Sequence, residues 1–547
     1  MELAKLLIPE NTPDFADIVA KFPKRELPES AKVVRVAPSP TGSPHFGLVF
    51  AAMVDEAIAY QTKGLFFLRI EDTDKKREVD GGIGKIIEAF ANFDVKYSEG
   101  PVSETEELGK YGPYIQSKRQ EVYLSATKLL LDKGFAYPCF CTPEKLDEVH
   151  KTQEARKEKT GYYGKYATCR DLGLDEVKKN LELQKPFVIR FKSPVDSVAT
   201  KYFDAIKGEV SLPENYIDYV LVKSEGAGLG LPVYHLAAMV DDYLQGVNLV
   251  IRGDEWLPSL PVHLQIIDAF GWKRPEFGHL SPVMKMDGQT TKRKLSKRKD
   301  PEAAASFYVE QGIPASAVRA YVLNIADSRF EDWRKENPEA NLLDFPFEIT
   351  HMGSAGALFD MTKFLDICKQ EIANMKAEDI YDLVLSWATK YKPDFALIFS
   401  KDKDYSVKML NIERQGEKKR KDISQWSQVP DLFGYFYDEL FVRNFVDIKT
   451  ENIVEISEVK RIFEKYIDVL DLSDPKEVWF EKFKLVCSEF GYPSMKEYKL
   501  DSSSLKGHFG DVAMILRIAL TGKTMTPDLY EMMQVMGRDR VYSRLSS

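Results

Sequence analysis

Cysteine is scarce in this sequence, at five residues in 547. A low and odd count favours a reducing compartment over a framework of disulfide bonds. No apolar run approaches the roughly 20 residues that a membrane-spanning helix needs. The first fifteen residues include Glu2, Lys5 and Glu10 and lack the apolar stretch of a signal peptide. These absences predict a soluble, cytoplasmic protein with no membrane partner.

A positive overall charge is also absent, since the formal net charge is −9. Phosphate binding in nucleic acids depends on lysine and arginine, so a uniformly basic surface is excluded. Cations are instead concentrated in Thr291–Asp300 (TKRKLSKRKD) and Lys418–Lys421 (KKRK). The second cluster is most simply a solvated charge run, whereas the first must be interpreted in its context.

Length and composition predict several folded domains. Hydrophobic residues make up 44% of the chain and aromatic residues 12%, enough to fill several cores. At roughly 150 residues per domain, the length corresponds to three or four of them. The first residues, 1–31, form an extension in which four prolines are expected to interrupt any regular element.

A strand, a loop, a helix and a second strand follow this extension. Residues 33–37 predict a buried strand, 45–61 a helix that Gly64 ends, and 65–70 the next strand. A βαβ unit of this kind implies parallel strands with a right-handed crossover.

The parallel pattern resumes much later in the chain. A strand at 247–252 precedes a helix at 257–270, so the residues between about 120 and 225 are interpreted as an insertion. Beyond about 305 the pattern is mostly helical, with amphipathic stretches at 375–393, 452–470 and 505–520.

The loop after the first strand, SPTGSPHFG (39–47), predicts a phosphate site. Ligands of open parallel sheets bind beyond the strand carboxyl ends, and free N–H groups at a helix N-terminus favour phosphate. His45 can donate to a phosphate oxygen, and Gly42 and Gly47 allow close approach. Neither G-x-x-x-x-G-K-[ST] nor G-x-G-x-x-G occurs. By itself, His45 is more often a capping or packing residue.

A second motif, KLSKR (294–298), lies just after the second half of the predicted sheet. A flexible loop carrying Lys294 and Lys297 is suited to closing over a triphosphate and stabilising a five-coordinate α-phosphate. As an isolated string it is more often a solvated loop or a localisation signal. Its combination with His45 favours the phosphate interpretation.

The order and spacing of six motifs resemble class I aminoacyl-tRNA synthetases, and among them the glutamyl-tRNA synthetases. The motifs are RVAPSPTGSPHFG (35–47), FLRIEDTDKKR (67–77), GPYIQSKR (112–119), VYHLAAMVDDYLQG (233–246), VIRGDEWL (250–257) and KLSKRKD (294–300). The resemblance covers residues 33–360. It implies an α/β fold, with a Rossmann-like parallel-sheet catalytic domain, an inserted α+β domain and mostly helical C-terminal domains.

The same resemblance implies a division of the chain into six parts. These are an N-terminal extension (1–31), the first catalytic half (32–120), an inserted acceptor-end-binding domain (121–230), the second catalytic half with the Lys-Ser-Lys loop (231–304), a stem-contact helical domain (305–375) and a helical anticodon-binding domain (376–547).

Residue roles are carried over from the resemblance position by position. Glutamate binding is assigned to Arg35, Ser39, Glu71, Tyr234 and Arg252. Bidentate arginine suits a carboxylate, and an unpaired guanidinium inside an apolar strand would be costly.

ATP binding is assigned to His45, Gly47, Glu255, Trp256 and Lys297, and catalysis to His45, Gly47, Lys294 and Lys297. The sequence departs from the family at Leu48, which suggests contact through the backbone alone, and at Ala238, where some relatives place a polar residue. An ion-pair role remains open for four acidic residues, which are not assigned as catalytic: Asp72, Asp74, Asp241 and Asp242.

The implied reaction joins L-glutamate to tRNA(Glu) in two steps through glutamyl-adenylate, with ATP and Mg²⁺ as the substrate complex. A monomer is expected. The alternatives are a relaxed enzyme that also charges tRNA(Gln), and a non-catalytic RNA-binding protein on a synthetase scaffold.

Three cysteines need separate consideration. Cys139, Cys141 and Cys169 resemble a zinc-binding knuckle of some family members, but the closing C-x-H pair is absent. A structural zinc site needs four ligands, and Tyr163, Tyr166 or His150 would have to supply the last. Buried thiols are therefore favoured over zinc.

Overall fold

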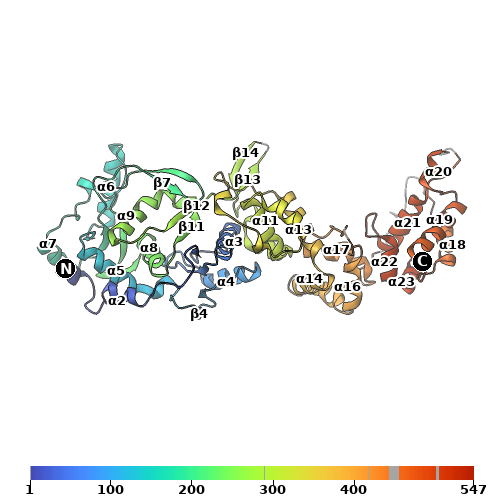
Figure 1. Cartoon of the computed structure of the whole chain (residues 1–547), viewed down its shortest axis with the longest axis horizontal. Helices are drawn as coiled ribbons and strands as arrows, with labels where there is room; N and C mark the ends of the chain where they lie inside the picture. Colours follow the sequence, from blue (N-terminus) through green and yellow to red (C-terminus); the bar gives the residue numbers. More distant parts are fainter. Residues whose placement is uncertain (1, 289, 417, 443–454, 501–503, 547) are drawn as a thin grey trace. The chain divides into compact units, whose positions relative to one another are not determined.

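A computed structural model describes the whole chain except residues 1, 289, 417, 443–454, 501–503 and 547 (Figure 1). The chain forms two compact units. The first comprises Met1–Phe307 and Val318–Met361, and the second Tyr308–Ala317 and Thr362–Ser547. Among the described residues, every helix falls short of the length and apolar character that spanning a bilayer requires.

The parallel strands form the centre of the first unit. Strand β1 (Val33–Val36) pairs in parallel with β2 (Leu65–Leu68), and β11 (Leu249–Gly253) pairs in parallel with β12 (Glu276–Leu280). The Asn248 side chain accepts from the Val33 N–H at 2.8 Å, and the Asn248 N–H donates to the Val33 carbonyl at 3.2 Å. These bonds place β11 beside β1, so the two halves of the predicted sheet meet.

The crossover helix α3 (Phe46–Gln61) confirms the helix expected between β1 and β2. Its end requires glycine for a packing reason, because a Cβ on Gly64 would lie 1.9 Å from the Lys32 carbonyl oxygen. The chain therefore turns from α3 into β2 directly against the residue that precedes β1.

The residues between the sheet halves form an antiparallel sheet with helices. Its strands follow the order β10-β9-β6-β5, and a separate hairpin joins β7 to β8. Their bounds are β5 (Ala136–Cys139), β6 (Val188–Phe191), β7 (Thr200–Asp204), β8 (Gly208–Leu212), β9 (Val220–Glu225) and β10 (Gly228–Pro232). One hydrophobic cluster contains residues from this sheet, such as Ile189, and from the parallel strands, such as Val250.

The prolines of residues 1–31 interrupt the regular structure there but do not exclude it. Two short helices, α1 (Glu2–Leu7) and α2 (Phe15–Ala20), form in the stretches that lack proline. Each buries apolar side chains, including Leu7 and Phe15, against the core of the first unit. Burial of one face compensates for the shortness of each helix.

The remaining elements of the first unit are α4 (Gly82–Asn92), β3 (Gly100–Pro101), β4 (Glu107–Leu108), α5 (Gln120–Asp132), α6 (Pro143–Ala155), α7 (Leu174–Glu182), α8 (Tyr234–Leu244), α9 (Leu260–Phe270), β13 (Met284–Asp287), β14 (Thr291–Lys294) and α12 (Phe330–Glu336). Helices α10 (Ala305–Gln311) and α11 (Ala315–Ala326) lie where the chain passes between the units.

The second unit is helical, as the amphipathic pattern predicts (yellow to red in Figure 1). Its helices are α13 (Met361–Asn374), α14 (Ala377–Tyr391), α15 (Pro393–Phe399), α16 (Lys403–Asn411), α17 (Val429–Phe433), α18 (Ile456–Val469), α19 (Lys476–Glu489), α20 (Met495–Leu500), α21 (Phe509–Thr521), α22 (Leu529–Met536) and α23 (Arg538–Ser546). The start of the stretch predicted at 452–470 lies outside the described residues.

Candidate active site

The N-terminus of α3 carries the first group of site residues. His45 caps the helix, since its Nδ1 accepts from the Leu48 N–H at 3.2 Å. Gly47 is needed beside it, because a Cβ there would lie 2.9 Å from the His45 ring. The Leu48 N–H is thus engaged within the cap, while Ser39 is exposed earlier on the same loop. With Nδ1 as acceptor, Nε2 of a neutral ring carries the proton and is the donor.

The KLSKR motif lies against this loop. The Lys297 Nζ donates to the carbonyl of Ser43, two residues before His45. The chain passes close again at Ala304, which forms an antiparallel bridge with His45. The structure therefore brings together two motifs that are separated by about 250 residues in the sequence.

Lys294 does not lie in a flexible loop, which corrects the sequence expectation. It is the last residue of β14, which pairs antiparallel with β13 and places Lys294 opposite Met284. Asp300 holds the turn that follows, because its carboxylate accepts from Arg293 at 2.5 and 2.7 Å and from the Ser296 N–H at 3.0 Å. Lys297 therefore extends from an anchored turn.

The charges around His45 disfavour its protonation. Desolvation by surrounding protein atoms lowers the pKa of His45, Lys297 and Lys294 lower it further, and Glu255 opposes them. Desolvation also lowers the pKa of Lys297. A neutral imidazole donor beside two lysine cations is suited to an anionic ligand.

Arg252, at the end of β11, is held by neutral histidines. Its Nε donates to His279 Nε2 at 3.0 Å, and its Nη1 lies 2.9 Å from His263 Nδ1. Burial lowers the pKa of His263 well below its usual value, and the positive charge of Arg252 contributes to the same shift. The His279 Nδ1 faces Asp204 at 2.6 Å, which leaves Nε2 as the acceptor for Arg252. The guanidinium orientation is thus set by side chains from α9 and β12.

Aromatic residues border Arg252. The Tyr234 hydroxyl lies 3.4 Å from Arg252 Nη1, and the Tyr234 and Trp256 rings are 4.0 Å apart between centroids. Trp256 belongs to a short 3-10 helix, Asp254–Ser259, which also carries the exposed Glu255. Because Glu255 acts electrostatically on His45, this segment connects the histidine motif with the surroundings of Arg252.

Arg35, in β1, is nearly enclosed, with 2% of its surface exposed. Its Nε donates to Asp242 at 2.9 Å and its Nη1 to the Ile251 carbonyl, the residue before Arg252, at 3.3 Å. Arg35 and Arg252 therefore lie on neighbouring strands. Although burial alone would raise it, the pKa of Asp242 is held below its usual value by Arg35 and Arg69.

Glu71 is also buried and pairs with Arg69 at 2.9 Å. Arg69 in turn donates to Asp242 at 2.7 Å, and Arg119 donates to Asp241 at 2.8 Å. Asp241 and Asp242 are thus ion-pair residues of a buried network. Asp72 accepts from Lys75 and from the Ser117 hydroxyl, and Asp74 from Arg77.

Sequence reasoning did not single out Arg69, His263 or His279. Arg69 carried the same signal as Arg35 and Arg252, an arginine within a short apolar strand (LFFLRI). The histidines carried a weaker one, because isolated histidines in an apolar helix and strand are usually packing residues. Their role depends on contacts that the chain makes only when folded.

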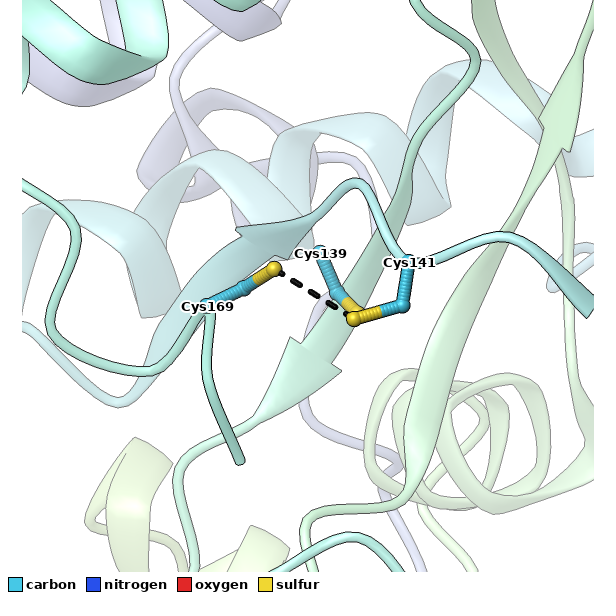
Figure 2. Close-up of side chains that lie close together, drawn as sticks. All are labelled: Cys139, Cys141 and Cys169. Carbon is cyan, nitrogen blue, oxygen red and sulfur yellow. Dashed lines mark hydrogen bonds between the residues drawn. The ribbon is translucent and has the colours of Figure 1, made fainter. Parts of the chain in front are cut away.

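The three cysteines form a second site in the inserted sheet (Figure 2). Their sulfur atoms all lie within 4.8 Å of one another, and Cys141 and Cys169 are 3.6 Å apart. Zinc–sulfur bonds of about 2.3 Å in a tetrahedron require sulfur atoms about 3.8 Å apart, so the thiols fit zinc.

The residue facing the three thiols differs from the three expected. The hydroxyl of Tyr162 lies 3.2 Å from Cys141 Sγ and accepts from the Cys169 N–H at 3.0 Å. Tyr163 and Tyr166 instead donate to Lys159 and Glu158, and His150 is exposed. The sequence offered no reason to prefer Tyr162 over its neighbours, because only the fold determines which ring turns inward.

Comparisons with known proteins identify the family. Residues 32–329 match the family model described as tRNA synthetases class I (E and Q), catalytic domain, and residues 500–547 match one described as an anticodon binding domain. The chain is 43% identical to a glutamate–tRNA ligase of Acetivibrio thermocellus, covering 100% of this chain and 98% of the relative, and 44% identical to one of Clostridium perfringens strain 13, covering 99% of each.

A solved structure is similar as well. A glutamate tRNA ligase from Elizabethkingia meningosepticum, crystallised in complex with its amino acid, has a TM-score of 0.76 and 28% identity, covering 94% of this chain and 98% of that one. These matches extend over the whole length and include the catalytic sheet. The chain therefore belongs to the glutamate–tRNA ligases of the class I tRNA synthetase family.

Proposed function

We propose that the protein activates L-glutamate with ATP and Mg²⁺ to form glutamyl-adenylate and transfers the glutamyl group to the 3′ end of tRNA(Glu). The glutamate α-carboxylate attacks the α-phosphate, pyrophosphate leaves, and the terminal ribose hydroxyl of the tRNA then attacks the acyl carbon. The observation that carries this proposal is the contact of Lys297 with the loop of His45, joined through Glu255 and Trp256 to Arg252.

The ATP phosphates bind at the start of α3. The His45 Nε2–H, the N-terminal end of α3 and the Lys294 and Lys297 ammonium groups supply donors and positive charge there. Mg²⁺ accompanies the phosphates and shields their charge. Gly47 keeps the first turn of the helix free of a side chain that would displace His45.

Glutamate binds between the strand ends that carry Arg35 and Arg252. Arg252, held by two neutral histidines, is directed toward Tyr234 and binds a carboxylate. Arg35 and Glu71 act with Tyr234, since all three interact electrostatically. Ser39 on the neighbouring loop completes the polar contacts.

The tRNA engages the rest of the chain. Residues 121–230 hold the acceptor end, 305–375 contact the stem, and 376–547 bind the anticodon. A cavity of about 840 Å³ in the last of these has a mixed lining, with the cationic Lys465, Lys482 and Arg538, the carboxylates of Asp468, Asp471 and Glu489, and the ring of Tyr542. Lys465 and Lys482 are paired with Glu489 and Asp474. The ring of Tyr542 and the planar group of Arg538 offer a surface for stacking an unstacked base.

The protein acts as a cytoplasmic monomer in this proposal. Charging of tRNA(Gln) as well as tRNA(Glu) is the second candidate, because no described residue yet distinguishes the two anticodons. Aminoacylation of the two purified tRNAs side by side separates these candidates.

Cys139, Cys141 and Cys169 are the residues that would hold a zinc ion, with the Tyr162 hydroxyl as the fourth group beside them. Such an ion would be structural, because its ligands would tie the strand β5 to the turn at Cys169 within the acceptor-end region. Figure 2 shows that Cys169 reaches the other two thiols from a separate segment.

The test of the proposed function is pyrophosphate exchange into ATP, measured with glutamate and tRNA present. Lys297→Ala should lower the rate at least tenfold, or about 1.4 kcal/mol of barrier, because a cation near the reacting phosphate is lost. Lys299→Ala removes the same charge from the exposed end of the same turn and should change the rate less than twofold. Equal rates for Lys297→Ala and the unmodified protein would contradict the proposed site.

A further inference from the structure

Within residues 2–31, several side chains contact the rest of the first unit. The Phe15 ring lies 5.8 Å from the rings of Phe270 and Trp272 between centroids. Lys128 on α5 donates to the Thr12 carbonyl and to Asp14. Beyond α2, the chain continues to Arg25, whose side chain is 9% exposed. The segment therefore reaches from the surface helices to the buried network of the site.

Arg25 uses its guanidinium to join two distant parts of the catalytic fold. Its Nη1 and Nη2 donate to the two oxygens of Glu99 at 2.9 and 2.7 Å. Its Nε donates to the main-chain carbonyl of Gln245 at 2.8 Å. The guanidinium carbon also lies 3.7 Å from the centre of the Tyr111 ring. A bidentate pair combined with a third bond and a stacked ring leaves little rotational freedom.

The two partners of Arg25 lie next to elements of the site. Glu99 bridges to Phe67 in β2 and accepts from the Tyr114 hydroxyl at 2.7 Å. Gln245 directly follows α8, and its side-chain oxygen accepts from Arg69 at 3.1 Å. Arg25 thereby connects the strand of the first catalytic half to the end of the helix from the second half.

The carboxyl end of α8 contacts Arg35, one of the residues proposed to bind the substrate glutamate. Asp242 lies three residues before Gln245 and accepts from both Arg35 and Arg69. The opposite end of α8 begins with Tyr234, which borders Arg252. A shift of the last turn of α8 would therefore move the carboxylate that orients Arg35.

We propose that Arg25 is a positioning residue for glutamate. It holds the carboxyl end of α8 against Glu99, and through Gln245, Arg69 and Asp242 it keeps Arg35 in the orientation that binds the substrate. The ATP site at His45 and Lys297 does not depend on this connection, because those residues are held by the α3 cap and by Asp300. This inference rests on the proposed function of Arg35.

The test compares Michaelis constants for the two small substrates in the full-length protein with tRNA present, at a temperature where every variant is folded. Arg25→Ala should raise the KM for glutamate about fivefold and change the KM for ATP less than twofold. Arg25→Lys retains the charge but cannot pair with Glu99 and Gln245 together. Its KM for glutamate should lie between those of the unmodified protein and Arg25→Ala. The control, Lys21→Ala, removes a surface cation from the same segment (63% exposed) and should match the unmodified protein.

Arg35→Ala is measured in parallel to separate the positioning role of Arg25 from the assignment of the glutamate site. If Arg35→Ala raises the KM for glutamate and Arg25→Ala does not, the positioning role is refuted and the proposed function stands. If neither changes it, the assignment of the glutamate site is wrong. Equal increases of both Michaelis constants for Arg25→Ala, or a lower melting temperature with unchanged constants, would show a purely structural role and overturn the inference.

Discussion

Replacement of Asp242 by asparagine tests the buried network on which the glutamate site depends. The carboxylate accepts from Arg35 at 2.9 and 3.3 Å and from Arg69 at 2.7 Å. After Asp242→Asn, Arg69 keeps Glu71 at 2.9 Å and Asp241 at 3.9 Å. The asparagine amide keeps one acceptor oxygen but no charge, so the Ile251 carbonyl at 3.3 Å is the acceptor of Arg35 that the substitution leaves unaltered. One buried cation, rather than two, is therefore left without its principal counterion.

The expected loss of stability follows from this buried cation without a counterion. Removal of one partner from a buried ion pair destabilises proteins by about 3–5 kcal/mol. At about 2 °C per kcal/mol, the value for larger domains, the apparent melting temperature should fall by at least about 6 °C. The KM for glutamate should rise as well, because Arg35 loses the group that orients it.

The assay is differential scanning calorimetry combined with the KM for glutamate. Asp147→Asn, on the exposed side of α6, makes the same chemical change away from the network and should leave both values unaltered. A fall of less than about 2 °C for Asp242→Asn, or about 1 kcal/mol on the same scale, would refute the reasoning. It would show that another group balances the charge of Arg35.

Two further predictions concern a buried carboxyl group and the thiols. Burial raises the pKa of Asp55 well above its usual value, and Arg35 opposes this. Because the pKa is higher in the folded than in the unfolded protein, ionisation of Asp55 lowers the stability as the pH rises above the pKa of the unfolded state. The melting temperature of Asp55→Asn should therefore increase relative to the unmodified protein between pH 5 and 8, and a constant difference would contradict this. Purified protein should contain about one zinc per chain by mass spectrometry. Cys169→Ser should abolish zinc binding, and Cys368→Ser should leave it unchanged. A metal-free unmodified protein would exclude the zinc site.

Several local features of the fold could be predicted from the sequence because they depend on neighbouring residues. The apolar run of β1, the proline-free helix α3 and the glycine that ends it are recognisable from periodicity and punctuation. The same signals placed His45 at the start of a helix. The prolines of residues 1–31 marked the breaks in that segment but not the short helices between them, which depend on the burial of Leu7 and Phe15.

The pairing of distant side chains could not be predicted in this way. Arg35 and Asp242 are 207 positions apart, and Lys297 and Ser43 are 254 apart. The resemblance to a family suggested which residues act together, but it indicated neither the histidines that hold Arg252 nor the contacts of Arg25.

The sequence by itself therefore determined the βαβ unit of the catalytic sheet, the helical character of the C-terminal part and the family. Only the tertiary structure decided which charges neutralise one another, which tyrosine faces the thiols and what the first 31 residues hold in place. The physical reason is that periodicity and capping act over a few residues, whereas desolvation and ion pairing depend on which surfaces the folded chain brings into contact.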